Sequence, residues 1–114
     1  MAPPKIAIST GDPAGIGPEV CIKLLENTEN FELYEPIIFG DSSVLEKTAD
    51  QYNIPIEVKN VTRLEEAEGP SILNIRAIGA EEYTTGRISA KTGKAAYQYL
   101  ARAMDAALEG KVDA

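Results

Sequence analysis

The sequence contains no histidine and only one cysteine, Cys21, among its 114 residues. Without histidine, the chain lacks both the commonest metal ligand and the commonest general base. A single cysteine cannot form a disulfide within the chain. Because Cys21 falls at an apolar position of an expected helix, we interpret it as a buried structural thiol.

Basic residues and long hydrophobic runs are also scarce. The 11 lysines and arginines face 18 aspartates and glutamates, which gives a formal net charge of −7. An acidic surface repels phosphate backbones and anionic lipid head groups, so neither nucleic acid nor a membrane surface is an expected partner. No apolar run approaches the roughly 20 residues of a membrane span, and the first residues do not resemble a signal peptide. We therefore expect a cytoplasmic protein.

The residues that are present have the composition of one globular domain, with 44% hydrophobic and 25% charged residues. Apolar runs predict strands at 5–9, 34–40, 54–61 and 71–75, and amphipathic stretches predict helices at 18–27, from Asp41 or Ser42 onward, and at 91–109. This alternation favours a doubly wound α/β fold with a mostly parallel sheet. We expect the first three strands to be parallel, with helices on both faces. Residues 111–114 resemble the approach to another strand, so residues 1–114 are interpreted as a partial α/β domain.

Several local patterns refine this outline. Ser43 and Glu46 have the spacing of a capping box, and Gly110 is suited to end the last helix. The segment 77–89 is polar, turn-rich and long for a connection in a compact domain, which indicates a functional loop. The acidic segment 62–69 is expected to be solvated. The last helix is predicted to have one apolar face, formed by Ala96, Leu100, Ala103, Met104 and Ala107.

The most informative motif is the glycine-rich loop at residues 10–19, TGDPAGIGPE. Its three glycines let the backbone turn sharply and approach a ligand closely, and the start of the following helix suits a phosphate. The loop lacks the Gly-Lys-Ser/Thr of a Walker motif, and Val20 stands where the dinucleotide fingerprint has a third small residue. Glycine content alone therefore leaves two alternatives open, a ligand-binding loop and a tight turn that binds nothing.

The complete loop resembles the N-terminal motif of the 4-hydroxythreonine-4-phosphate dehydrogenase family. It is also similar to the shorter Gly-Asp-Gly-Ile-Gly-Pro-Glu loop of the isocitrate and isopropylmalate dehydrogenases, which share that family's fold. Three further segments are similar to the family pattern, namely residues 39–41 (FGD), 86–96 (GRISAKTGKAA) and the closing residues Ala107, Gly110, Asp113 and Ala114. The resemblance covers the whole chain, and the chain is identified as an N-terminal segment of a longer member.

The resemblance implies an enzyme that oxidises 4-phosphohydroxy-L-threonine with NAD or NADP, followed by decarboxylation, in pyridoxine and pyridoxal phosphate biosynthesis. A divalent metal (Zn, Mg or Co) polarises the reacting oxygens, and the full-length enzyme is expected to be a homodimer. In the family, histidines bind the metal, and they lie beyond the end of this chain. The sequence therefore supplies no catalytic residue and no metal ligand.

The resemblance places the cofactor neighbourhood at the glycine-rich loop, where it implies five residues, Gly11, Asp12, Gly15, Ile16 and Gly17. For other polar residues a structural role is the better interpretation. Glu19 is expected to favour the positive end of a helix, and Asp41 to be a helix N-cap rather than a ribose ligand. Lys91 and Lys94 are expected on a solvated face. Tyr97 and Tyr99 are expected to pack in the core or at a subunit interface.

Two alternatives to this function stay open. The enzyme can act on a related phosphorylated four-carbon sugar acid, because none of these residues separates the two substrates. The chain can also be a non-catalytic phosphate- or nucleotide-binding module, if 114 residues is its natural length.

Overall fold

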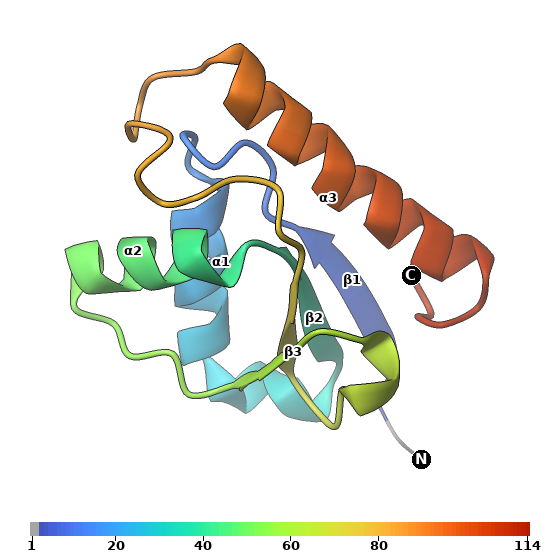
Figure 1. Cartoon of the computed structure of the whole chain (residues 1–114). Helices are drawn as coiled ribbons and strands as arrows, with labels where there is room; N and C mark the ends of the chain where they lie inside the picture. Colours follow the sequence, from blue (N-terminus) through green and yellow to red (C-terminus); the bar gives the residue numbers. More distant parts are fainter. Residues whose placement is uncertain (1–2) are drawn as a thin grey trace.

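A computed structural model describes residues 3–114 as three layers, with helices on both faces of one sheet (Figure 1). The four strands pair in the order β1-β2-β4-β3, and every pairing is parallel. The strands are β1 (Lys5–Ser9), β2 (Glu35–Gly40), β3 (Lys59–Val61) and β4 (Ser71–Asn74). The α-helices are α1 (Gly17–Glu26), α2 (Ser42–Tyr52) and α3 (Ala90–Leu108), and the short 3-10 helices are η1 (Thr28–Glu32) and η2 (Leu64–Glu66). The predicted parallel α/β fold is confirmed.

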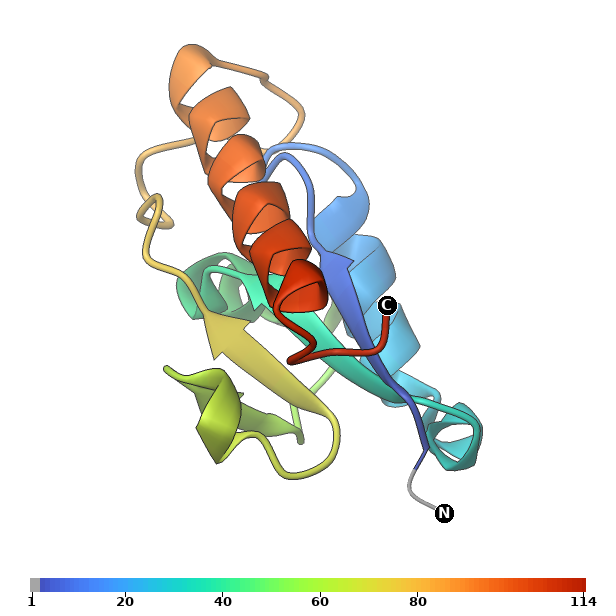
Figure 2. The same ribbon diagram turned by 90° about the vertical axis from the view of Figure 1, so that its right-hand side faces the viewer.

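Strand β2 shows why the helices divide between two faces. Ile37 and Phe39 belong to the apolar cluster that α3 covers, whereas Ile38 belongs to the cluster under α1 and α2. Successive side chains of a strand point to opposite faces, so a strand that is apolar throughout needs a cover on each side. Figure 2 shows α3 on one side of the sheet and α1 on the other.

The third strand is shorter than predicted. Only Lys59–Val61 pairs with β4, whereas residues 54–58 form no ladder. Pro55 lacks the N–H that a ladder needs. Ile54, Ile56 and Val58 nevertheless pack against the cluster beneath α1 and α2. The apolar alternation of residues 54–58 therefore predicted their packing correctly, but it did not predict which residues pair with a neighbouring strand.

The start of α2 also differs from the prediction in its polar contacts. Asp41 is the N-cap residue of α2, as expected, but its side chain makes no capping hydrogen bond. The N–H of Ser42 instead donates to the side-chain oxygen of Asn74 at the end of β4, at 2.9 Å. The predicted capping box of Ser43 and Glu46 is wrong, because the helix already begins at Ser42.

The last helix is rotated relative to the predicted face. Its buried residues are Thr92, Ala95, Tyr99, Ala103 and Ala106. Leu100 and Met104, which belong to the predicted apolar face, are about half exposed. Gly110 follows the helix with a φ of +74°, which confirms its predicted place at the helix end.

The final residues lie along the free edge of β1. The N–H of Ala114 donates to the carbonyl of Lys5 at 3.3 Å, and the N–H of Ala7 donates to the carbonyl of Ala114 at 2.7 Å. Ala114 thus bonds both Lys5 and Ala7, which are two positions apart on β1, and this is the hydrogen-bond pattern of a parallel ladder. The chain therefore runs from β1 to β2 in one direction, and returns across α3 to the opposite edge of β1 (Figure 2).

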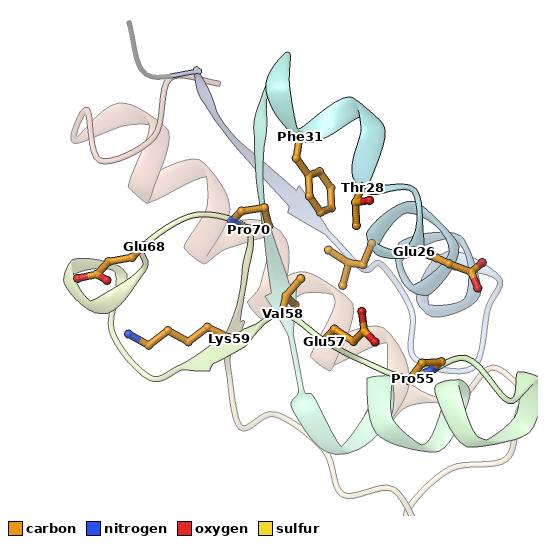
Figure 3. A pocket seen from close by; sticks show the side chains of 10 residues that line it. Glu26, Thr28, Phe31, Pro55, Glu57, Val58, Lys59, Glu68 and Pro70 are labelled. Carbon is orange, nitrogen blue, oxygen red and sulfur yellow. The ribbon is translucent and has the colours of Figure 1, made fainter.

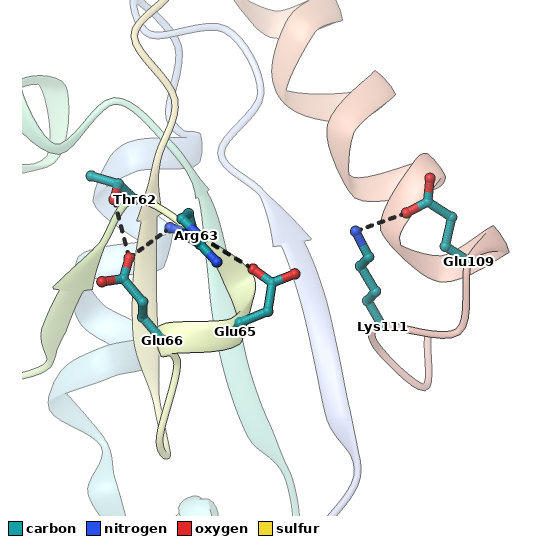
Figure 4. Close-up of polar contacts among 6 residues, drawn as sticks. All are labelled: Thr62, Arg63, Glu65, Glu66, Glu109 and Lys111. Atoms are coloured by element: carbon teal, nitrogen blue, oxygen red, sulfur yellow. Dashed lines mark hydrogen bonds and ion pairs between the residues drawn. The ribbon is translucent and has the colours of Figure 1, made fainter.

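The segment between β3 and β4 is largely exposed, as expected. The side chain of Glu66 accepts hydrogen bonds from the hydroxyl of Thr62 and the N–H of Arg63, each at 3.1 Å (Figure 4). Ion pairs of Arg63 with Glu65 and of Lys111 with Glu109 lie nearby on the surface, at 3.7 and 3.0 Å. Within residues 3–114, no helix is long and apolar enough to cross a membrane.

Candidate cofactor site at the glycine-rich loop

The glycine-rich loop leaves β1 at the edge of the sheet where the parallel strands end. The N–H of Thr10 still bonds the carbonyl of Phe39 on β2, at 3.2 Å, and the chain then turns away toward α1. Asp41 follows β2 and Asn74 ends β4 at the same edge. The connection from β1 leads through α1 to β2 on one side, whereas the chain returns after α3 to the other side of β1. In open α/β sheets, ligands bind outside the carboxyl ends of the strands at such a switch point.

Hydrogen bonds within the loop fix its shape. The Asp12 carboxylate accepts from the N–H of Ala14 at 2.8 Å, and the Asp12 carbonyl accepts from the N–H of Gly15 at 2.9 Å. The turn brings Ile16 to the N-cap position of α1, where its side chain is 77% exposed. The loop thereby presents an apolar side chain to solvent at the start of a helix.

Gly17 and Gly40 are needed for packing around Thr10, which is only 2% exposed. A Cβ atom on Gly17 would lie 1.7 Å from the carbonyl oxygen of Thr10. A Cβ on Gly40 would lie 2.7 Å from the Thr10 methyl group. Any side chain at either position would push the loop away from the sheet. These two glycines therefore close the loop on the sheet and do not face open space.

A cavity of about 330 Å³ lies between this loop and the segment 77–89. One wall is Pro13, Ala14, Gly15 and Ile16, a second is Thr85, Gly86 and Ile88, and the remainder comes from Glu19 and from Thr48, Gln51 and Tyr52 of α2. The N–H of Gly86 donates to the carbonyl of Ala14 at 2.7 Å and joins the two loops directly. The blue loop and the orange segment lie side by side in Figure 1.

The five residues that the resemblance assigned to the cofactor neighbourhood have different positions in the structure. Gly15 and Ile16 line the cavity, whereas Gly11 and Asp12 shape the turn behind it and Gly17 packs on Thr10. Their contact with a cofactor stays a prediction. Sequence reasoning missed the second wall at Thr85, Gly86 and Ile88, although the unusual length of the segment 77–89 was the signal for it.

Glu19 brings a negative charge to the start of α1. Its carboxylate accepts from the ammonium group of Lys23 at 2.7 Å and from the hydroxyl of Tyr52 at 2.6 Å. The Lys23 contact, followed by that of Tyr52, lowers the pKa of Glu19 below its usual value, so the group is ionised at neutral pH. Pro18 offers no N–H at this helix start. The start of α1 is therefore a poorer phosphate site than an ordinary helix N-terminus.

Asp41 has a structural role, as predicted. It is 4% exposed, and its carboxylate accepts from the backbone N–H groups of Ala77 and Ile78 and from the hydroxyl of Tyr99. Burial first, and then the bond to Asp41, raise the pKa of Tyr99 far above its usual range. Tyr99 is therefore a core residue, which was one of its two predicted roles; the other was a place at a subunit interface.

The remaining polar candidates lie on the surface of α3. Lys91 and Lys94 are exposed, as expected, and Lys91 lies 3.8 Å from the carboxylate of Glu82. Tyr97 is 72% exposed and takes no part in the core.

A larger cavity of about 590 Å³ opens at the other end of the sheet, between η1, β3 and the turn before β4 (Figure 3). Glu26, Glu57 and Glu68 line it together with Phe31. The ammonium group of Lys59 is directed to the backbone carbonyl of Glu66, at 3.1 Å. Three carboxylates repel an anionic dinucleotide, and the cavity lies at the amino ends of the strands, away from the switch point. The smaller cavity is therefore the better candidate for a cofactor.

The described residues offer no metal site. Across residues 3–114, no three acidic, cysteine or histidine side chains lie close enough together to hold a metal ion. Cys21 on α1 is buried against the sheet and α2, as predicted, and burial raises the pKa of its thiol to about 11. A thiol that is buried and has a raised pKa is a poor nucleophile, so a structural role fits Cys21.

Comparisons with known proteins agree with this geometry. A protein of Oceanobacillus iheyensis, provisionally named D-threonate 4-phosphate dehydrogenase, is 36% identical over 97% of this chain and 35% of its own length. The crystal structure of a 4-hydroxythreonine-4-phosphate dehydrogenase from Burkholderia phymatum superimposes with a TM-score of 0.84 at 32% identity, over 96% of this chain and 34% of that one. A terephthalate 1,2-cis-dihydrodiol dehydrogenase from Burkholderia xenovorans superimposes with a TM-score of 0.73 at 27% identity, over 96% of this chain and 31% of that one.

These relatives are about three times as long as the sequence described here, since the chain spans about a third of each. Residues 32–114 match the family described as pyridoxal phosphate biosynthetic protein PdxA. The match covers β2 through α3, and the solved structures extend the similarity to 96% of the chain, the glycine-rich loop included. The chain therefore belongs to the PdxA family.

Proposed function

We propose that this chain forms the cofactor-side, N-terminal part of an NAD(P)- and divalent-metal-dependent dehydrogenase that oxidises a phosphorylated four-carbon hydroxy acid. The observation that carries the proposal is the cavity between the glycine-rich loop and the segment 77–89, at the switch point of a chain of the PdxA family. The proposal includes a cytoplasmic, homodimeric full-length enzyme. Its partner is a phosphorylated small molecule rather than nucleic acid or a membrane.

The size and lining of the cavity support the binding of part of a dinucleotide. Its volume of about 330 Å³ lies near the lower end of the roughly 300–1,000 Å³ that small-molecule pockets span. Ile16 and Ile88 are 77% and 76% exposed and both line it. Two such apolar side chains can cover a flat ring and exclude water from it. The Glu19 carboxylate offers an acceptor to a ribose hydroxyl in the same cavity.

The proposed roles of this chain are therefore binding and orientation. A bound dinucleotide supplies the hydride acceptor. The loop 11–17 and the segment 77–89 would hold it against the carboxyl ends of the strands, and Ile16 and Ile88 would keep water out. The described residues do not fit a metal ion, so the metal and the general base are assigned to residues outside this chain.

Two substrates are candidates, and the relatives' names divide between them. The curated relatives are named for D-threonate 4-phosphate, at 30–36% identity. Three of the solved structures are named for 4-hydroxythreonine-4-phosphate, at 26–32% identity. The residues of this chain favour neither, because the substrate-binding side chains of the proposed enzyme lie elsewhere.

The test is steady-state kinetics of the full-length protein with each substrate, with NAD and with NADP, before and after removal of metal by a chelator. We expect reduction of one dinucleotide with at least one substrate, and loss of activity in the chelator with recovery on adding Zn²⁺, Mg²⁺ or Co²⁺. A full-length protein that binds dinucleotide but turns over neither substrate would favour the non-catalytic module.

A further inference from the structure

The Asp41 carboxylate at the end of β2 accepts several hydrogen bonds within the core. It accepts from the N–H of Ala77 at 3.0 and 3.2 Å, from the N–H of Ile78 at 3.1 Å, and from the hydroxyl of Tyr99. None of these donors belongs to α2, although Asp41 is the N-cap residue of that helix. The carboxylate thus ties β2 to α3 and to the first residues of the segment 77–89.

Two further contacts hold the same segment. The ammonium group of Lys47 on α2 donates to the carbonyls of Ala80 and Tyr83, at 2.9 and 3.3 Å, and lies 3.9 Å from the centre of the Tyr83 ring. At its far end the N–H of Gly86 donates to the carbonyl of Ala14. Polar contacts therefore run from Asp41 through the segment to the glycine-rich loop.

We propose that Asp41 is a positioning residue for the candidate cofactor site, and that it acts through the segment 77–89. Fixing Ala77 and Ile78 sets where Thr85, Gly86 and Ile88 stand opposite Gly15 and Ile16. Asp41 itself is 4% exposed and is not among the residues that line the candidate cofactor cavity. A buried acceptor cannot be removed without leaving its donors unsatisfied, so loss of the carboxylate releases the start of the segment. The identity of the ligand rests on the proposed function, whereas the positioning role does not.

The first test is hydrogen exchange of the full-length protein without cofactor. Asp41→Asn keeps the size of the side chain and removes one acceptor oxygen, and Tyr99→Phe removes one donor and leaves the two backbone bonds. Ser71→Ala is the matched control, because Ser71 is fully buried, its hydroxyl donates to the carbonyl of Gly69 at 2.9 Å, and it lies at the opposite end of the sheet.

We expect amide exchange in the segment 77–89 and at residues 11–17 to speed up about tenfold in Asp41→Asn, by less in Tyr99→Phe, and not in Ser71→Ala. Unchanged exchange in both segments in Asp41→Asn, or equal acceleration in Ser71→Ala, would overturn the positioning role. If Asp41→Asn does not fold, hydrogen exchange of Tyr99→Phe tests the positioning role instead. Acceleration confined to those two segments supports the proposal, and unchanged or uniformly faster exchange opposes it.

The second test is titration of the same proteins with NADH, followed by its fluorescence. The dissociation constant is expected to rise about tenfold in Asp41→Asn and to stay unchanged in Ser71→Ala, even where the two variants lose similar thermal stability. Equal affinity in wild type and Asp41→Asn would contradict the link to the cofactor. If the wild type binds no NADH, the proposed function fails, and the exchange experiment still decides the role of Asp41.

Discussion

At the scale of residues, the buried residue Thr10 restricts two neighbouring positions to glycine. Its carbonyl and methyl groups occupy the space where side chains on Gly17 and Gly40 would stand. Both glycines lie in segments that resemble a dehydrogenase family, yet the structure explains them by packing alone. The residues of the loop that face the cavity are Pro13, Ala14, Gly15 and Ile16.

Gly17→Ala is therefore expected to destabilise the protein severely. The new Cβ would overlap the Thr10 carbonyl, 1.7 Å away, and we expect the free energy of unfolding to fall by about 3 kcal/mol or more. Gly93→Ala is the control, because it is exposed in α3 with nothing within 4 Å, and it should raise the free energy of unfolding by about 0.5–1 kcal/mol. Urea titration measures both, and equal effects would contradict this packing.

Cys21 is expected to resist modification in the folded protein. Burial raises the pKa of its thiol from 9.0 to about 11, so at pH 8 the thiolate is about 100-fold rarer than in the unfolded chain. A disulfide reagent should react at least about 100-fold more slowly with native than with urea-unfolded protein. The neutral thiol favours the folded state fully below pH 9, and this contribution is lost as the pH rises toward 11. Comparable rates in the two states would show that the thiol is accessible.

At the scale of elements, α3 is the case in which hydrophobicity predicted the helix and misplaced its face. The helix bounds were right to within one residue, but Leu100 and Met104 of the predicted apolar face are half exposed. Small alanines face the sheet instead, and Tyr99 reaches Asp41 across the core. A buried hydrogen bond between residues 58 positions apart leaves no periodic signal in the sequence.

Two substitutions in α3 test which face is buried. Ala95→Leu adds three carbon atoms where the side chain is 1% exposed and should cost about 1–3 kcal/mol of stability. Leu100→Ala removes a side chain from a residue that is 50% exposed and should cost less than about 1 kcal/mol. Chemical denaturation compares the two. A larger loss in Leu100→Ala would favour the face predicted from the sequence.

The same division between local and distant signals explains the rest of the fold and the site. Strands β1, β2 and β4 and all three α-helices follow from apolar runs and glycine or proline signals, which are local. The cap of α2 comes from Asn74, 32 residues away, and the second wall of the cavity comes from Thr85, Gly86 and Ile88. Contacts of this kind depend on how the chain returns to the sheet, so one sequence alone did not reveal them.

At the scale of the whole molecule, the chain spans about a third of its relatives. Residues 3–114 hold no cluster that could bind a metal ion, and stabilising the charge of the reacting alcohol needs one in the proposed chemistry. We therefore expect the isolated 114 residues to reduce neither NAD nor NADP with either substrate, in the presence of Mg²⁺ or Zn²⁺. Turnover close to that of a full-length relative would place the chemistry within this chain.

The most direct test of the central claim is the cofactor KM of Gly15→Val in the full-length protein, measured together with its Tm. Gly15 lines the cavity, and a Cβ there would approach the Asp12 carbonyl only to 3.3 Å, so a small shift accommodates it. A bulky side chain on this wall should raise the cofactor KM about tenfold or more, with little change in substrate KM and a Tm lowered by only a few degrees. A lowered Tm with an unchanged cofactor KM would show that the loop is a structural turn and that the cofactor lies elsewhere.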